Sequence, residues 1–196
     1  YVSVQAGINI LDISSVQRRD PYPVVPQLST HLWTDGFFNQ HSVPVTYDGK
    51  RYIFTPDEAG SGGVKVIDVS DPTRPVIEHK IKLEINLPDN IDSNFRSASG
   101  GSVFNYDAHY CAVDRPTNPT TLACSWIQSG IRVFDVSDLN DIREIAYYNP
   151  PAQTHKNLQL TNSTHAVASM IGVPLWDFVP LAMAIVDGRF DPGTAL

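Results

Sequence analysis

One nine-residue phrase occurs three times in this chain, and it constrains the fold more strongly than any other feature of the sequence. The copies are GINILDISS from Gly7, GVKVIDVSD from Gly63 and GIRVFDVSD from Gly130. Each copy has a glycine, apolar residues at alternate positions, and then an aspartate, an apolar residue and a serine. A strand with its exit turn, repeated at long intervals, is typical of repeat architectures. The phrase therefore predicts an all-β fold built from similar units.

The alternation within the phrase predicts how each strand is buried. In the second copy, the β-branched residues Val64 and Val66 suit a pleated surface and share one face. Lys65 lies between them, and Asn9 and Arg132 take its place in the other copies. We therefore expect one face of each strand to be buried and the other face to be at least partly in water.

The ends of the phrase predict turns. The opening glycine suits a positive φ angle or a close approach of two backbones. Asp12, Asp68 and Asp135 are each followed two residues later by serine. An aspartate in this position accepts hydrogen bonds from nearby backbone N–H groups and so ends the strand.

Further apolar runs predict the other strands of each unit. HSVPVTYDG, RYIFTPDE and VIEHKIKL surround the second copy, and SVFNYDAHYCAVD, TTLACSWI and REIAYYNPP surround the third. The expected unit is a four-stranded antiparallel sheet, as in a propeller blade. We expect residues 37–80 and 98–148 to form two such blades that pack face to face. Residues 1–16 are then the end of another blade, and residues 149–196 are a loop-rich tail.

The longer phrases carry a family resemblance. GVKVIDVSDPTRPV and GIRVFDVSDLNDIREIAYYNPP resemble the repeats of the LVIVD-repeat proteins, a bacterial and archaeal group of mostly uncharacterised, often exported β-propellers. The resemblance covers residues 1–152. It implies that residues 1–196 are one propeller domain or part of one. It implies little about chemistry, because propellers carry many different functions.

The spacing of the phrase predicts insertions. The intervals are 63 − 7 = 56 and 130 − 63 = 67 residues, against about 40 to 50 for common propeller blades. We expect one insertion around PYPVVPQLSTHLWTDGFFNQ and another around LPDNIDSNFRSASGG, both as long loops. Loops on a rigid scaffold are where binding functions gather.

The number of units raises the question of ring closure. Propellers usually need four or more blades, whereas the sequence supplies two nearly whole blades and the end of a third. The chain also opens inside an expected strand, at Tyr1. We expect the open faces to be covered by further blades of the same polypeptide or by other subunits. The alternative is a small protein that completes its ring by association.

Composition excludes some partners. The formal net charge is −7 and no Lys/Arg cluster is present, so nucleic acid is not an expected partner. The one long apolar tract, VASMIGVPLWDFVPLAMAIVDG, is interrupted by Pro174, Asp177 and Pro180. A bilayer span needs about 20 consecutive apolar residues, so no membrane span is expected.

Cys111 and Cys124 are the only two cysteines, and they lie in strands that flank the polar loop RPTNPTT. A hairpin would place them side by side, and we predict a disulfide; the alternative is a pair of buried free thiols. A disulfide suits an exported protein, so the expected location is secreted, extracellular, periplasmic or on the cell surface. Asn162 begins a glycosylation sequon.

Histidines are the main candidates for metal chemistry. His41, His109 and His165 each lie at or before an expected inner strand. If they converge near a propeller axis they could bind Cu, Fe or Zn, since imidazole suits these ions. The arrangement is similar to the propeller architecture of the selenium-binding protein and methanethiol oxidase family, although none of its motifs is present. The spacings of 68 and 56 residues echo the repeat, so the alternative is that these histidines hydrogen-bond to neighbouring blades.

Asp57 and Glu58 precede a glycine-rich turn, and two carboxylates could bind Ca²⁺. Adjacent residues on a strand point to opposite faces, however, which disfavours a paired acid/base role. No catalytic set is predicted.

Two classes of function remain open. The first is a non-enzymatic extracellular or cell-surface module that binds a protein or glycan partner or has a structural role. The second is a metal-dependent oxidoreductase or hydrolase whose histidines meet near the axis. The first is preferred, because the spacing of the candidate metal-binding histidines is already explained by the repeat.

Overall fold

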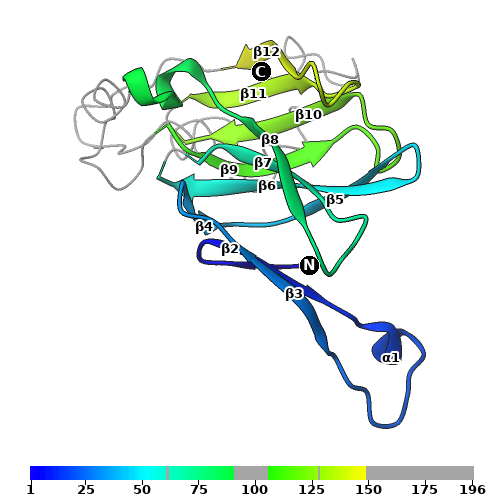
Figure 1. Cartoon of the computed structure of the whole chain (residues 1–196). Helices are drawn as coiled ribbons and strands as arrows, with labels where there is room; N and C mark the ends of the chain where they lie inside the picture. The colour runs from blue at the N-terminus through cyan, green and yellow to red at the C-terminus, as the bar shows by residue number, and fades with distance from the viewer. Residues whose placement is uncertain (61, 91–105, 128, 149–196) are drawn as a thin grey trace, which may run out of the picture.

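The computed structural model describes residues 1–60, 62–90, 106–127 and 129–148. These residues form three antiparallel sheets, with a single short α-helix and two short 3-10 helices between strands (Figure 1). The prediction of an all-β chain with antiparallel sheets is confirmed. None of the described helices is long and apolar enough to cross a membrane. Residues 149–196, which include Asn162 and His165, lie outside the described residues.

The first sheet has three strands in the order β1-β2-β3. Its strands are β1 (Val2–Val4), β2 (Gly7–Leu11) and β3 (Gln27–Leu32), and helix α1 (Ser14–Gln17) lies between β2 and β3. The expectation that residues 21–40 form one long loop was wrong. They contain β3, the strand that follows the repeated phrase in every unit, and here an insertion between β2 and β3 displaces it along the sequence.

The second sheet has five strands instead of the four expected. Its long strand β6 pairs with β5 through Lys50–Phe54 and with β4 through Asp57 and Ala59. One edge of β6 therefore serves two short strands. The strands are β4 (Phe37–Asn39), β5 (Val43–Tyr47), β6 (Lys50–Ala59), β7 (Val64–Asp68) and β8 (Val76–Ile81).

The third sheet has four strands in the order β9-β10-β11-β12. The 3-10 helices η1 (Glu84–Asn86) and η2 (Pro88–Asn90) follow the second sheet. The strands of the third sheet are β9 (Ala108–Val113), β10 (Thr121–Trp126), β11 (Gly130–Asp135) and β12 (Arg143–Tyr148).

The sheets are stacked, and each junction has its own core. Between the first and second sheets, Ile8 and Ile10 of β2 join a buried cluster with Ile53 and Ile67. Between the second and third sheets a larger cluster includes Phe54, Val66, Leu122, Cys124, Trp126 and Phe134. The second sheet is therefore covered on both faces, which is why most side chains of β6 and β7 are buried on both sides.

The exit turns of the phrase form as the sequence predicts. The Oδ1 atom of the aspartate accepts a hydrogen bond from the serine amide two residues later in all three copies, at 2.8 Å for Asp12, 2.7 Å for Asp68 and 2.9 Å for Asp135. The glycines also have the two predicted roles. Gly63 and Gly130 have φ angles of 69° and 71°, whereas a Cβ atom on Gly7 would collide with the backbone of β3.

One irregularity recurs in every sheet. The pairing between the phrase strand and the strand that follows it shifts register between Ile10 and Leu11, between Val66 and Ile67, and between Val133 and Phe134. These are the fourth and fifth residues of each copy. The three units thus share a β-bulge at one place, and a bulge bends the strand and increases its twist.

Candidate functional site

The disulfide joins the two strands that the sequence indicated. Cys111 of β9 and Cys124 of β10 are direct partners in the antiparallel ladder, with Cα atoms 4.1 Å apart, and their sulfur atoms are bonded. Both residues belong to the core between the second and third sheets. The predicted disulfide is therefore confirmed.

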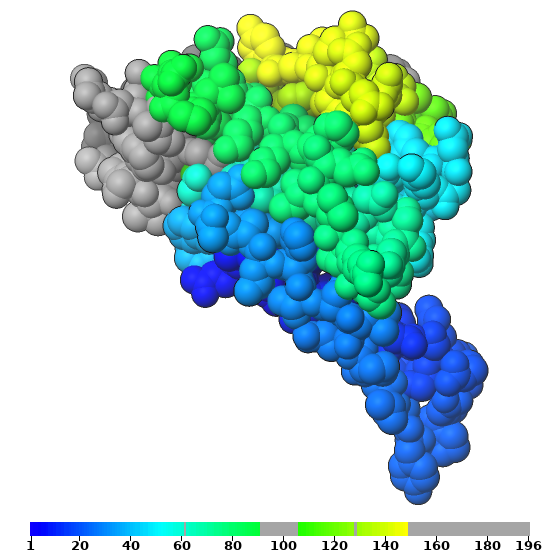
Figure 2. Space-filling view, viewed as in Figure 1, coloured from blue at the N-terminus to red at the C-terminus, as the bar shows by residue number. Residues whose placement is uncertain are grey.

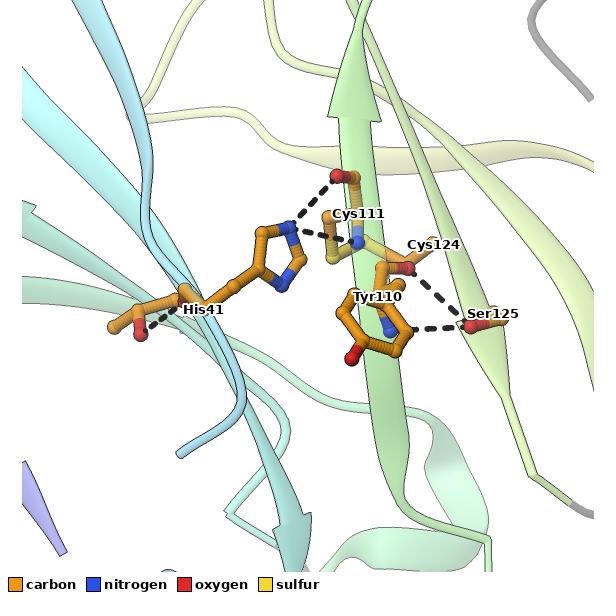
Figure 3. The surroundings of a disulfide bond; sticks show 6 residues. His41, Tyr110, Cys111, Cys124 and Ser125 are labelled. Carbon is orange, nitrogen blue, oxygen red and sulfur yellow. Dashed lines mark hydrogen bonds between the residues drawn. A yellow bond between two sulfur atoms is a disulfide. The ribbon is translucent and has the colours of Figure 1, made fainter. Parts of the chain in front are cut away.

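His41 lies beside this disulfide, on the chain between β4 and β5. Figure 3 shows its side chain extending from the second sheet to β9. Its Nε2 atom is 3.0 Å from the carbonyl oxygen of Cys111 and 3.4 Å from the amide nitrogen of the same residue. Burial lowers the pKa of His41 and outweighs the opposing hydrogen bond to Cys111. The imidazole is therefore held in its neutral form, as a polar link between two sheets.

A second polar group lies next to His41. The Nε2 atom of His109 is 3.4 Å from Oε1 of Glu58, and the side-chain amide of Gln40 donates to Oε2 of Glu58. The ring of Tyr110 stands 5.0 Å from that of His41 and 4.3 Å from that of His109, centroid to centroid. The structure thus brings two of the three predicted histidines to one aromatic ring, at the junction of the second and third sheets.

The third predicted histidine, His165, lies outside the described residues. Among the residues that the structure does describe, no three His, Cys, Asp or Glu side chains are grouped closely enough to hold a metal ion. His41 and His109 are engaged by the Cys111 backbone and by Glu58. These contacts correspond to the alternative in which the histidines link neighbouring units.

The adjacent carboxylates Asp57 and Glu58 point to opposite faces of the second sheet. Glu58 faces His109 of the third sheet. Asp57 faces the first sheet, where its carboxylate accepts from the indole of Trp33 at 3.1 Å and from the ammonium of Lys65. The two groups therefore belong to different sites, as the alternation of side chains along a strand requires.

The expectation that Lys65 points to a partly wet face was wrong. Its side chain is 0% exposed, because the first sheet and the Trp33 ring cover this face of the second sheet. The Lys65 Nζ atom lies 4.6 Å from the centroid of the Trp33 ring, in a cation–π contact. This burial could not be predicted, because Trp33, which covers Lys65, lies in a segment that was expected to be a loop.

Two more charges connect this buried cation to the surface. Oδ1 of Asp35 is 3.4 Å from Nζ of Lys65, and Oδ2 of Asp35 is 2.5 Å from Nζ of Lys80, which is partly exposed. Asp35 follows Trp33 in the connection from the first to the second sheet. Two oppositely charged pairs therefore hold this connection against β7 and β8.

The pKa directions agree with this arrangement. Burial acts to raise the pKa of Asp35, but the ammonium groups of Lys80 and Lys65 outweigh it, so the pKa of Asp35 falls below its ordinary value. Burial raises the pKa of Asp57, and Lys65 and Trp33 act against that effect. Lys65 thus lies between the two carboxylates, Asp57 from the second sheet and Asp35 from the connection after the first.

Glycines make room for the buried carboxylate. A Cβ atom on Gly36 or on Gly62 would collide with Oδ2 of Asp57. Both glycines are buried. The glycine-rich segment after β6 therefore serves close packing around Asp57, which is a role that the sequence did not reveal.

Exposed apolar side chains gather on the first sheet and its surroundings. Eleven of the sixteen exposed large apolar residues in the described chain lie within the first 38 residues. They include Val2 and Leu32, which share the face of the first sheet that points away from Ile8 and Ile10. The other nine are Tyr1, Ile13, Val16, Tyr22, Val24, Val25, Leu28, Phe37 and Phe38.

The junction of the second and third sheets also opens into grooves. One of about 370 Å³ lies between Lys80 and Lys82 on one side and Asn140 and Glu144 on the other. Burial lowers the pKa of Lys82 here. The grooves combine charges of both signs with a few apolar side chains, which is a suitable surface for polar ligands.

No family model matches this chain, and no curated protein matches it.

Proposed function

We propose that the three sheets are blades of a β-propeller of the LVIVD-repeat type. The sheets contain the same three-strand series, β1-β2-β3, β6-β7-β8 and β10-β11-β12, with the same Asp-Ser turn and the same bulge. In the second and third sheets an inner strand, β5 or β9, precedes that series. Face-to-face packing of such repeated sheets is how propeller blades associate.

We further propose that the protein is a non-enzymatic, exported module that binds a protein or glycan partner. The observation that carries this function is the concentration of exposed apolar side chains on the first sheet and on the segment between β2 and β3. Monomeric proteins rarely expose apolar patches larger than a few hundred Å², and larger patches mark interaction surfaces. The proposal includes a further blade of the same polypeptide or another subunit as the partner that covers this surface.

The disulfide supports the exported location. Disulfides persist in oxidising compartments and are uncommon in the cytosol. The Cys111–Cys124 bond links two strands of a core that is already well packed. Its expected role is to keep this core intact outside the cell.

The experiment that tests the function is a binding screen of the intact protein against arrays of glycans and of extracellular proteins. Leu32→Ser removes an exposed apolar side chain from the first sheet, and Val76→Ser removes one of similar exposure from β8. The proposal requires a specific ligand whose binding is lost in Leu32→Ser and kept in Val76→Ser. Binding that both variants retain equally would contradict an interaction surface on the first sheet.

The metal-dependent oxidoreductase or hydrolase is retained as a second candidate on one observation. The Nδ1 atom of His41 is buried and has no hydrogen-bond partner among the described residues, and a neutral imidazole is a metal ligand. Elemental analysis of the purified intact protein decides between the two functions. Stoichiometric copper, iron or zinc that is lost in His41→Gln would favour the enzyme, whereas calcium alone would leave the binding module in place.

A further inference from the structure

A rigid arm extends from the first sheet. We define it as residues 12–26, between β2 and β3, and Figure 2 shows it projecting from the rest of the molecule. At its base the amide of Asp12 donates to the carbonyl of Pro26 at 2.9 Å. Within it the hydroxyl of Ser15 donates to the carbonyl of Val24, and the amide of Asp20 donates to the carbonyl of Ser15 at 3.0 Å. These bonds, together with the prolines of the segment, favour one shape of the arm.

The tip of the arm is apolar and open to solvent. It has the sequence PYPVVP from Pro21 to Pro26, in which the three prolines restrict the backbone. The Tyr22 side chain is 91% exposed and that of Val24 is 69% exposed. An ordered, preorganised segment loses little conformational entropy on binding, so its apolar side chains contribute efficiently to association.

An apolar pocket lies on the body of the protein. It has a volume of about 210 Å³, and its lining is mostly apolar, with Tyr1, Pro44, Tyr52 and Pro116, beside Thr117 and one charged residue, Arg51. Its walls are fixed, because the amide of Thr46 donates to Pro116 at 2.9 Å and the amide of Asn118 donates to Thr46 at 2.7 Å. The pocket is therefore preformed, like the tip of the arm.

The arm and the apolar pocket lie at the same end of the stacked sheets. The arm begins at Asp12, where the first phrase strand ends. The pocket lies near the β5–β6 and β9–β10 turns. The strands β6 and β10 begin after these turns, and they pair there with the ends of the other two phrase strands, Tyr52 with Asp68 and Thr121 with Asp135. Figure 1 shows the arm leaving the body at this end and pointing away from it. An arm with this direction does not reach the pocket of its own chain, but it is placed to enter that of another copy.

Charges at this end favour the same partner. Arg18 pairs with Asp20, which leaves Arg19, the next residue, without an ion pair among the described residues. The carboxylates of Asp48 and Asp138, on the turns at the same end of the body, likewise have no cationic partner within the described chain. An arm cation and body carboxylates therefore remain to be paired, on a protein whose net charge is −7.

We propose that two copies of this chain associate by exchanging arms, with the PYPVVP tip of each copy in the apolar pocket of the other and Arg19 near Asp48. The arrangement is reciprocal, as a two-fold symmetric interface requires. It rests on the proposed function, in that it names the partner of the surface formed by the first sheet and its arm. It commits that surface to self-association.

A cross-linking experiment with two full-length variants tests the contact directly. Tyr22→Cys is prepared with one affinity tag and Thr117→Cys with another, and the two are mixed under mild oxidation. The expected product is a disulfide-linked pair that carries both tags. Leu87→Cys replaces Thr117→Cys as the matched control, since Leu87 is also exposed but lies outside the pocket lining. A yield no higher than that of the control would overturn the proposal.

Sedimentation of the full chain provides the second measurement. The expected result is a concentration-dependent dimer whose Kd rises at least tenfold in Tyr22→Ser and stays unchanged in Val76→Ser. A wild-type protein that stays monomeric overturns the proposal. Binding to phosphatidylglycerol vesicles that Tyr22→Ser abolishes, with no dimer, would instead assign the tip to a membrane. If no dimer forms but the protein still binds a glycan or protein through Leu32, the arm exchange is wrong and the proposed function is kept.

Discussion

Lys65 and Asp57 form an ion pair in which both side chains are fully buried, at the junction of the first and second sheets. The pair crosses from β7 to β6, and Trp33 contacts both partners from the connection after β3. A buried charge is tolerated only when it is paired and hydrogen-bonded. The junction therefore depends on Lys65, Asp57 and Trp33. The sequence pattern singled out Lys65 and Asp57 but not Trp33.

Replacing one member of this pair should be strongly destabilising. Lys65→Met leaves Asp57 buried without its cation, and the expected loss in the free energy of unfolding is about 3 to 5 kcal/mol. The double variant Lys65→Met with Asp57→Leu should recover most of that loss, because no unpaired charge remains. Denaturant titration of the two variants measures both effects.

The surface pair of Arg18 and Asp20 is the matched control. Arg18→Ala should change the free energy of unfolding by less than about 1 kcal/mol, since exposed ion pairs contribute little. A cost for Lys65→Met as small as that for Arg18→Ala would show that water reaches the buried pair.

The disulfide should stabilise the junction of the second and third sheets. It closes a loop with a sequence separation of 13 residues, and closing a loop of this length in the unfolded chain is worth about 3 kcal/mol in the chain-entropy model. Replacing Cys111 and Cys124 together by alanine should therefore lower the melting temperature, as measured by calorimetry. Addition of a reductant should lower it in the wild type and leave it unchanged in the double variant.

Two glycines separate backbone strain from steric collision. Gly49 and Gly63 have φ angles of 83° and 69°. A Cβ atom on Gly49 meets nothing within 4 Å, whereas one on Gly63 would collide with the carbonyl oxygen of Ile81. Gly49→Ala should cost about 1 kcal/mol, from the left-handed conformation alone. Gly63→Ala should cost clearly more, and equal costs in chemical denaturation would show that the β7–β8 pairing relaxes freely.

His41 should make stability depend on pH. Its pKa in the folded protein lies below its ordinary value of 6.5, because of burial. As the pH falls below 6.5 the unfolded chain takes up a proton before the folded chain does, so the free energy of unfolding decreases through this window. Urea titrations between pH 8 and pH 5 should show a smaller decrease in His41→Gln, and the decrease that persists in this variant reports the other titrating groups. An unchanged slope would place water at the His41 ring.

Local features of this fold could be predicted from the sequence because they depend on a few adjacent residues. The Asp12, Asp68 and Asp135 turns need only an aspartate and an amide two residues later. The pairing of Cys111 with Cys124 follows from two strands and the turn between them. Each of these features is decided within a hairpin or less.

Features that depend on another sheet could not be predicted. Lys65 occupies the position of Asn9 and Arg132 in the phrase, yet Arg132 is partly exposed and pairs with Glu144. The difference arises from Trp33, which covers Lys65 and lies 32 residues earlier in the chain. The strand β3 could not be predicted for a similar reason, since an insertion separates it in sequence from the phrase strand β2 with which it pairs. Periodicity shows which residues share a face but not what covers that face.

The bulge that recurs at the fourth and fifth residues of every phrase has a consequence for the redesign of this chain. Because the bulge lies at the same positions in all three units, each phrase strand bends and gains twist at the same point. Residues 50–81 contain the bulge between Val66 and Ile67. An artificial array that repeats this segment would therefore twist at every unit, and no residue would have to be changed to produce the twist.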